Sequence, residues 1–311
     1  MTPVRPAVLG IAGFGLIVPD LALAERFYLD YGLEACGGDA TRRFRSPGRD
    51  AAEVTVSPGA KKRLHFVSFH IPAGSEAVFA ERLQRHGIAT AAAPGAELPA
   101  GLWFQDPWGT WFHLSTAPMQ PLGEIALPAY NFGGRSERVD IALWTELKAP
   151  RGPLKLGHIL LFTPEWERAE AFYSEVLGLR TTDRTSGKVC FMAAGDGVID
   201  HHCFGLIRDR ARGFQHASFQ VADFDEIGLN AWRMREAGYR EAFGPGRHAL
   251  ASNLFHYVRD PWGSWIEYYA DMDKISPEWE CRDWQNLPYI WGPGWSPEFW
   301  GKEMNANFEA D

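Results

Sequence analysis

The chain has 311 residues, of which 46% are hydrophobic and 23% charged, and its formal net charge is −8 at pH 7. This composition is typical of globular domains with a substantial core. The absence of basic runs argues against nucleic acid as a partner, and no apolar stretch approaches the roughly 20 residues that cross a membrane. The four cysteines are scattered without CxxC spacing, so we expect a reduced, cytoplasmic protein.

The first predicted elements are a strand and a helix. Residues 10–19 are apolar, rich in glycine and end at proline, a pattern that predicts a strand. Asp20 can then cap a helix that runs to about Tyr31. The same order returns in the second half, where residues 157–164 predict a strand and a helix follows that ends before Gly178.

Two further pairs of segments extend this repeat along the chain. Residues 64–71 correspond to residues 214–221, and each half carries an Asp-Pro-Trp-Gly turn, beginning at Asp106 and at Asp260. Proline and glycine favour the turn, and an aromatic and apolar run of strand type follows each one. Matches in the same order, with slowly growing offsets, predict a duplicated module.

Each module is predicted to contain a strand, a helix, several strands, a second helix and further strands, which makes the fold α+β. The second helices are expected near residues 75–86 and 224–237. We divide the chain into an N-terminal module, a connecting segment rich in proline and glycine, a C-terminal module and a tail rich in tryptophan and proline. Their predicted limits are 1–118, 119–153, 154–272 and 273–311.

Overlaying the modules isolates three positions at which only the second module has a complete set of ligand-type residues. The second module carries His158, His216 and Glu267. The first module carries Gly13, Phe66 and His113. All three positions lie in predicted strands at matching places, so one sheet could present them to a common pocket.

A single histidine in an apolar strand is usually a hydrogen-bonded core residue and not a ligand. Three ligand-type residues on corresponding strands of one module, with the set incomplete in the other, favour a metal site instead. Two imidazoles and one carboxylate form the facial triad of non-haem Fe(II) sites. Nitrogen and oxygen ligands without thiolate suit iron or manganese better than a sulfur-rich zinc site.

Further polar residues cluster in the second module. His201 and His202 are adjacent where a strand should begin, and alternation along a strand would send them to opposite faces. Only one of them can face the pocket, and the Cys-Phe-Gly-Leu run that follows favours His202, with His201 serving mainly local packing. Residues 244–248 predict a tight, glycine-shaped loop that carries His248. Asn253 and Tyr257 then precede the second Asp-Pro-Trp-Gly turn.

Together these residues resemble the type I extradiol ring-cleaving catechol dioxygenases of the vicinal oxygen chelate (glyoxalase/bleomycin resistance/dioxygenase) superfamily, over nearly the whole chain. The resemblance implies two tandem modules, each made of paired βαβββ units in a curved, mostly antiparallel sheet around a pocket. It implies that Fe(II), with Mn(II) as the alternative, is bound only in the second module, by His158, His216 and Glu267. His202, His248 and Tyr257 would be catalytic, and with Asn253 they would contact the substrate.

The implied substrate is a catecholic aromatic compound that is cleaved with O2, in a protein expected to form homo-oligomers. The residue types suit this chemistry, because a catechol could occupy two open metal positions and leave a third for O2. Metal charge lowers the pKa of a bound hydroxyl, and histidine can move protons near neutral pH. The resemblance also suggests that residues 287–293 of the tail form a lid over the pocket.

Three other functions stay open. A 2-oxo-acid dioxygenase of the 4-hydroxyphenylpyruvate type would share the fold and the triad, but His202 and His248 favour ring cleavage. A glyoxalase-like isomerase or lyase would draw its ligands from both modules, and Gly13 with Phe66 argues against that. A non-catalytic small-molecule binding protein would have no need of a full triad.

Overall fold

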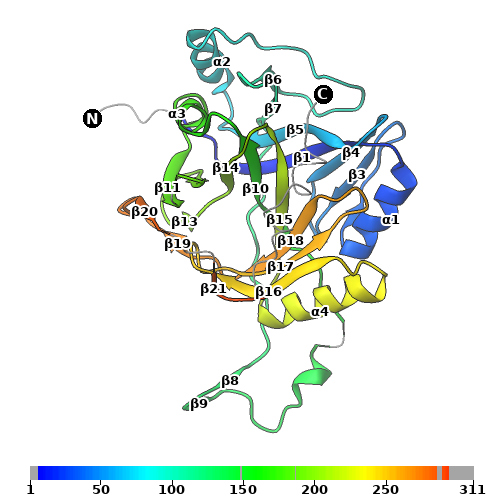
Figure 1. Cartoon of the computed structure of the whole chain (residues 1–311). Coiled ribbons are helices and arrows are strands. Elements are labelled where there is room, and N and C mark those ends of the chain that lie inside the picture. Colours follow the sequence, from blue (N-terminus) through cyan, green and yellow to red (C-terminus); the bar gives the residue numbers. More distant parts are fainter. Residues whose placement is uncertain (1–5, 148, 186, 286–288, 294–311) are drawn as a thin grey trace.

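The computed structural model describes residues 6–147, 149–185, 187–285 and 289–293. Two curved sheets lie side by side, and helices cover their outer faces (Figure 1). Among the described residues, no helix is both long and apolar enough to cross a membrane.

The first module consists of two halves that each open with a strand and a helix. The first half contains β1 (Gly10–Val18), α1 (Leu21–Tyr31), β2 (Glu34–Ala35), β3 (Arg42–Arg45) and β4 (Val54–Pro58). The second half contains β5 (Arg63–His70), α2 (Glu76–Arg85), β6 (Leu102–Gln105) and β7 (Trp111–Ser115). The strand order β2-β3-β4-β1-β5-β7-β6 places the opening strands of both halves at the centre of the sheet.

The second module repeats this plan with complete βαβββ units. Its first unit contains β10 (Lys155–Thr163), α3 (Trp166–Leu177), β11 (Arg180–Thr185), β12 (Val189–Ala193) and β14 (Phe204–Arg208). Its second unit contains β15 (Gly213–Gln220), α4 (Phe224–Glu236), β16 (Ala242–His248), β17 (Leu254–Arg259) and β18 (Trp265–Ala270). Again the opening strands, β10 and β15, pair at the centre, and the predicted α+β fold of duplicated modules is confirmed.

Short segments of the tail extend the second sheet at both edges. β20 (Arg282–Trp284) adds to β11 in parallel, and β21 (Tyr289–Trp291) adds to β16. β19 (Lys274–Ile275) pairs with the short β13 (Ile199–Asp200). The tail is therefore part of the sheet that carries the ligand-type residues.

Local signals explain the helix boundaries. Asp20 accepts a hydrogen bond from the Leu23 backbone at 2.9 Å, and Gly32 ends α1 with a positive φ of 102°. In α4, Asp223 accepts from the Glu226 backbone at 3.0 Å in the same way. The predicted helices are thus confirmed, and so is the predicted cap at Asp20, while α2 and α3 begin without a side-chain cap.

One predicted loop was wrong. Residues 244–248 belong to β16, which pairs with β17 and contains a register shift between Phe243 and Gly246. A side chain at Gly246 would put its β-carbon 2.3 Å from the Phe255 ring. The glycines therefore reflect a bulged strand packed closely against an aromatic ring, and not a turn.

Among its described residues, the connecting segment contains only a small hairpin, β8 (Asn131–Phe132) with β9 (Arg135–Ser136), and the 3₁₀ helix η1 (Leu143–Thr145). Figure 1 shows this hairpin extending away from the two sheets. The predicted limits of the four parts stay a prediction.

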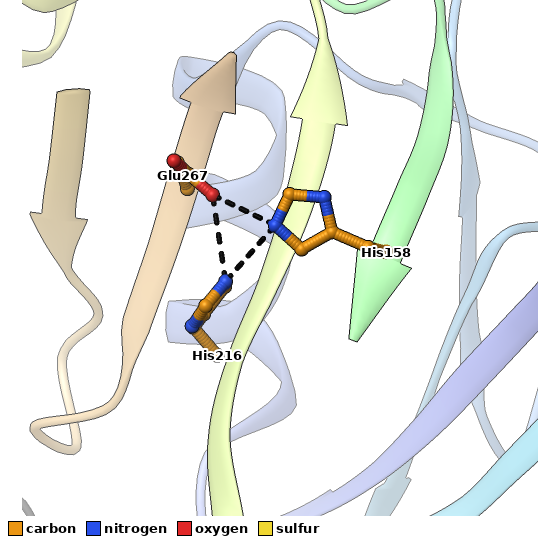
Figure 2. Close-up of side chains that lie close together, drawn as sticks. All are labelled: His158, His216 and Glu267. Atoms are coloured by element: carbon orange, nitrogen blue, oxygen red, sulfur yellow. Dashed lines mark hydrogen bonds and ion pairs between the residues drawn. The ribbon is translucent and has the colours of Figure 1, made fainter. Parts of the chain in front are cut away.

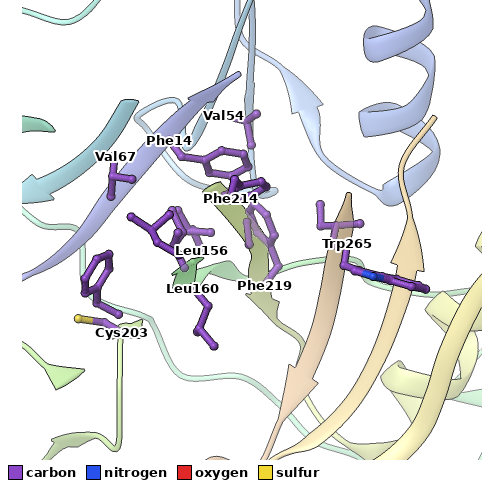
Figure 3. Close-up of a cluster of buried hydrophobic side chains, with 14 of the residues drawn as sticks. Phe14, Val54, Val67, Leu156, Leu160, Cys203, Phe214, Phe219 and Trp265 are labelled. Atoms are coloured by element: carbon purple, nitrogen blue, oxygen red, sulfur yellow. The ribbon is translucent and has the colours of Figure 1, made fainter. Parts of the chain in front are cut away.

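The hydrophobic core is continuous between the modules (Figure 3). Phe14 of β1 stacks on Phe214 of β15 with ring centroids 5.6 Å apart, and Val54 and Val67 belong to the same cluster as Leu156. Burial of so much aromatic and aliphatic surface is the main force that holds the two modules together.

Candidate metal and catalytic site

Three neighbouring strands of the second module bring a histidine pair and a glutamate together (Figure 2). His158 projects from β10, His216 from β15 and Glu267 from β18. The Nε2 atoms of the two histidines are 3.1 Å apart. Glu267 Oε2 lies 3.0 Å from His158 Nε2 and 3.4 Å from His216 Nε2.

This spacing fits a metal ion. Ligand atoms at about 2.1 Å from a metal, in adjacent octahedral positions, are about 3.0 Å from one another. The three distances between the ligand atoms of His158, His216 and Glu267 are close to that value. The three atoms can therefore occupy one face of an octahedron around a metal ion. Within the described part of the chain, this is the group of histidine, cysteine and acidic residues that could hold a metal ion.

The charge states of these residues also fit. Burial raises the pKa of Glu267, but its contacts with the imidazoles of His158 and His216 outweigh this effect and hold the pKa well below its usual value. Burial lowers the pKa of His216 to about 4. An anionic carboxylate and a neutral imidazole at pH 7 are the forms that bind a metal ion.

Bulges in β10 and β15 set the direction of the two histidines. The β10–β15 register shifts between Leu156 and His158, which leaves Gly157 as an extra residue next to His158. A β-carbon at Gly157 would lie 2.1 Å from the Tyr269 hydroxyl, so only glycine allows this close approach. Bulges of this kind commonly re-aim side chains beside active sites.

A second shift in the same pair makes Gln215 the extra residue on β15. Its Oε1 accepts a short hydrogen bond from His216 Nδ1, which leaves Nε2 of that ring as the ligand atom. Sequence reasoning missed Gln215, because strand alternation sends adjacent side chains to opposite faces. Only the bulge brings the two together.

His248 and Tyr257 lie on the Glu267 side of the site. His248 Nε2 is 3.1 Å from the Tyr257 hydroxyl and 3.6 Å from Glu267 Oε1. Tyr257 is the cross-strand partner of Glu267 in the β17–β18 register. Burial and the charge of Glu267 raise the pKa of Tyr257 well above its usual value, so its hydroxyl keeps its proton at pH 7.

His202 lies against the other side of the triad. Its ring centroid is 4.5 Å from that of His158, and 4% of the residue is exposed. Burial, then the neighbouring His158 and His201, lower the pKa of His202 well below its usual value, so the ring is neutral. The two adjacent histidines precede β14 in a bend, so the expectation that a strand begins there was wrong.

The predicted substrate contact of Asn253 is not tested by its position in the structure. Asn253 is buried, and its backbone carbonyl accepts from the His248 backbone at 3.0 Å, while its side-chain Oδ1 has no hydrogen-bond partner among the described residues. Its contact with substrate stays a prediction.

Of the proposed lid, residues 287 and 288 lie outside the described residues, and Tyr289 pairs with His248 at the sheet edge. The lid also stays a prediction.

Helix α1 of the first module contacts the strand β18 that carries Glu267. The Tyr31 hydroxyl on α1 donates to the Glu267 carbonyl at 2.7 Å, and the Tyr268 hydroxyl donates to the Tyr31 carbonyl at 2.8 Å. The two tyrosine rings stack with centroids 4.1 Å apart. The strand that carries the carboxylate is thus held by both modules.

Comparison with known proteins agrees with this arrangement. Residues 155–268 match the family model of the Glyoxalase/Bleomycin resistance protein/Dioxygenase superfamily. Metapyrocatechase 2 of Cupriavidus necator is 36% identical over 308 residues, which cover 97% of this chain and 94% of that protein.

Solved structures share the fold at lower identity. The Mn(II)-bound glyoxalase from Novosphingobium aromaticivorans has a TM-score of 0.78 at 22% identity, with 94% of each chain covered. A 2,3-dioxygenase from Pseudomonas sp. KL28 has a TM-score of 0.73 at 20% identity, covering 91% of this chain and 99% of that one. With all three ligand-type residues in one module and a metapyrocatechase matching along almost its full length, the chain belongs to the extradiol ring-cleaving catechol dioxygenases of this superfamily.

Proposed function

We propose that His158, His216 and Glu267 hold Fe(II) in this dioxygenase and that a catecholic substrate is cleaved there with O2. The observation that carries the proposal is the convergence of three ligand atoms from neighbouring strands, at 3.0 to 3.4 Å from one another. When bound, the metal lowers the pKa of a catechol hydroxyl and offers open positions to substrate and O2.

His202 is proposed to receive a proton from the substrate. Its ring is neutral at pH 7 and lies beside the ring of His158, so a catechol hydroxyl held near the triad is within its reach. Phe191 packs on the His202 ring with centroids 4.5 Å apart. This packing keeps water away and fixes the imidazole in one orientation.

His248 and Tyr257 are proposed to act on the opposite side of the substrate. Their mutual contact joins a ring nitrogen to a phenol that stays protonated at pH 7. Such a pair can donate hydrogen bonds to oxygen atoms on which negative charge develops, and can return a proton as the ring opens. Asn253 completes the proposed substrate contacts from the start of β17.

Manganese is the alternative metal, because nitrogen and carboxylate ligands suit both ions. The structurally similar glyoxalase from Novosphingobium aromaticivorans is bound to Mn(II). Metal-free protein reconstituted separately with Fe(II) and Mn(II) under anaerobic conditions should regain turnover with Fe(II). Turnover with Mn(II) alone would reverse the assignment.

The chain is also proposed to form homo-oligomers. The connecting segment carries large apolar side chains that the other described residues leave exposed, namely Leu127, Phe132, Val139, Ile141 and Trp144. An exposed apolar group of this kind is typical of a surface that packs on another subunit. Light scattering of the purified protein, compared with a Phe132→Glu, Trp144→Glu variant, tests this expectation.

The activity is tested with iron-loaded, anaerobically purified protein and a panel of catechols. Ring cleavage beside the two hydroxyls should give a yellow, ring-opened semialdehyde or oxo-dienoate, and ¹⁸O2 should label it with both oxygen atoms. A colourless cis,cis-muconate would contradict the proposed position of cleavage. Release of CO2 from a 2-oxo acid would indicate the 4-hydroxyphenylpyruvate type of reaction.

A further inference from the structure

A series of buried side chains leads from His202 to an aspartate that sequence analysis did not single out. Asp183 lies on β11, where its Oδ2 is 2.9 Å from His201 Nε2. His201 Nδ1 in turn is 3.1 Å from His202 Nδ1. Asp183, His201 and His202 are only 2%, 0% and 4% exposed, so bulk water does not compete for these contacts.

The direction of each hydrogen bond follows from what the groups can donate. A carboxylate only accepts, so His201 carries a hydrogen on Nε2. With its one hydrogen on Nε2, the His201 ring accepts at Nδ1, and the donor is Nδ1–H of His202. Nε2 of His202 is thereby left without a hydrogen.

The second oxygen of Asp183 is fixed as well. Its Oδ1 accepts hydrogen bonds from the Arg282 backbone at 3.0 Å and from Trp284 Nε1 at 3.1 Å, both on the tail strand β20. Donors at both oxygens hold the carboxylate in one orientation and prevent it from rotating. The orientation of Asp183 is therefore determined by the tail and transmitted to the two histidines.

We propose that Asp183 and His201 are positioning residues that hold His202 in the tautomer with a free Nε2. The inference rests on the proposed role of His202, which in this tautomer takes the proton of a catechol hydroxyl. The O–H bond breaks, an N–H bond forms at Nε2, and His202 becomes an imidazolium. In the opposite tautomer Nε2 already carries a hydrogen and has no lone pair to accept one. His201 then has a larger role than the local packing expected from sequence.

Asp183→Asn tests the proposal with little change of shape. Two donors still hold the Oδ1 position, so the amide oxygen takes that place and the NH2 group faces His201. His201 must then accept at Nε2 and donate from Nδ1, which inverts the tautomer of His202. An asparagine in place of the aspartate that orients a catalytic histidine is known to act in this way in serine proteases.

The primary readout is ¹⁵N NMR of the imidazole nitrogens in the full-length protein loaded with diamagnetic Zn(II). Wild-type His202 should show a protonated Nδ1 and a bare Nε2, and Asp183→Asn should reverse them. Iron-loaded Asp183→Asn should keep its iron content while its turnover falls by about 100-fold. Asp200→Asn is the matched control, because Asp200 lies one residue before His201 but pairs with Lys155 and Lys274. The Asp200→Asn variant should leave the tautomers of His201 and His202 and the turnover rate unchanged.

A hydrogen on Nε2 of wild-type His202 would overturn the proposal, and this measurement decides the matter even if Asp183→Asn does not fold. An unchanged His202 tautomer in folded Asp183→Asn would overturn it equally. The role of His202 fails separately: if the tautomers behave as expected but His202→Phe keeps full turnover, His202 is not the base, and the hydrogen-bonded series still stands.

Discussion

The central strands of the two modules pair in the same register, and the modules differ in the side chains at three positions of these strands. In the first module, Gly13 and His113 both pair with Ser68 in the sheet register. In the second module, His158 and Glu267 both pair with Ser218. The bulges coincide as well, since the register shifts just before Gly13 and just before His158. The metal site is therefore a matter of side chains on a backbone that both modules possess.

In the first module, packed aromatic rings and hydrogen-bonded side chains occupy the space that corresponds to the metal site. The Phe66 ring meets Trp103 edge-on at 5.0 Å. His113 bonds Ser68 Oγ at 2.8 Å through Nδ1 and the Ala100 carbonyl at 3.1 Å through Nε2, so neither ring nitrogen is available to a metal. A histidine at a ligand position therefore does not bind a metal when both of its ring nitrogens are hydrogen-bonded to neighbouring residues.

The largest effect is expected when a ligand is removed. Glu267→Ala and His216→Ala should each abolish stoichiometric iron binding and turnover, because two remaining ligands do not hold the ion. The matched controls are His113→Ala and Phe66→Ala, which occupy the same register positions in the first module and should keep the iron. Iron per chain and oxygen uptake measure both outcomes. Normal iron content in the two second-module variants would contradict the triad.

A triple variant tests whether the first module can be converted. Gly13→His, Phe66→His and His113→Glu together copy the ligand set, but a β-carbon at residue 13 would lie 2.9 Å from the Glu53 carbonyl oxygen. The backbone must shift, so we expect the free energy of unfolding to fall by about 2 to 3 kcal/mol. The metal content should stay at one ion per chain. Two ions per chain would show that the backbone tolerates a second site.

Loss of the proposed base should be smaller than loss of a ligand. His202→Phe should keep iron and catechol binding but turn over about 100-fold more slowly. His256→Phe is the control, because His256 is likewise buried in the same module, on β17, but its Nδ1 has no hydrogen-bond partner in the described part of the chain. Steady-state kinetics with iron analysis separates the two. Equal losses in both variants would mean that packing explains the effect.

The last expected effect does not touch the metal site and concerns pH and His113. Burial lowers the pKa of His113 from 6.5 to about 4 in the folded chain, so the unfolded chain binds more protons between these values. The stability that a neutral His113 provides is complete above about pH 6.5 and is lost as the pH falls towards 4. His113→Gln should flatten the pH dependence by up to one proton, or about 1.4 kcal/mol per pH unit. Urea unfolding of the iron-free protein at several pH values gives this slope, and an unchanged slope would contradict it.

Much of this could be predicted from the sequence, since turns, caps and ligand-type residues repeat at matching places. The Asp-Pro-Trp-Gly turns and the strand–helix openings were sufficient to predict two modules, and their overlay isolated His158, His216 and Glu267. What could not be predicted depends on departures from regular strands and on distant contacts. Gln215 meets His216 only because of a bulge, and Asp183 meets His201 only because β11 folds beside the bend before β14.

The contact between Tyr31 and the Glu267 carbonyl has a consequence for how the protein is made. The two residues are 236 positions apart in the chain. At about 5 to 20 residues per second, a ribosome takes roughly 10 to 50 s to travel that distance. During this time the nascent first module has no partner for the face that carries Phe14, Val54 and Val67. Such an apolar face favours aggregation, so the yield of folded protein should depend on chaperones that cover it until the second module is synthesised.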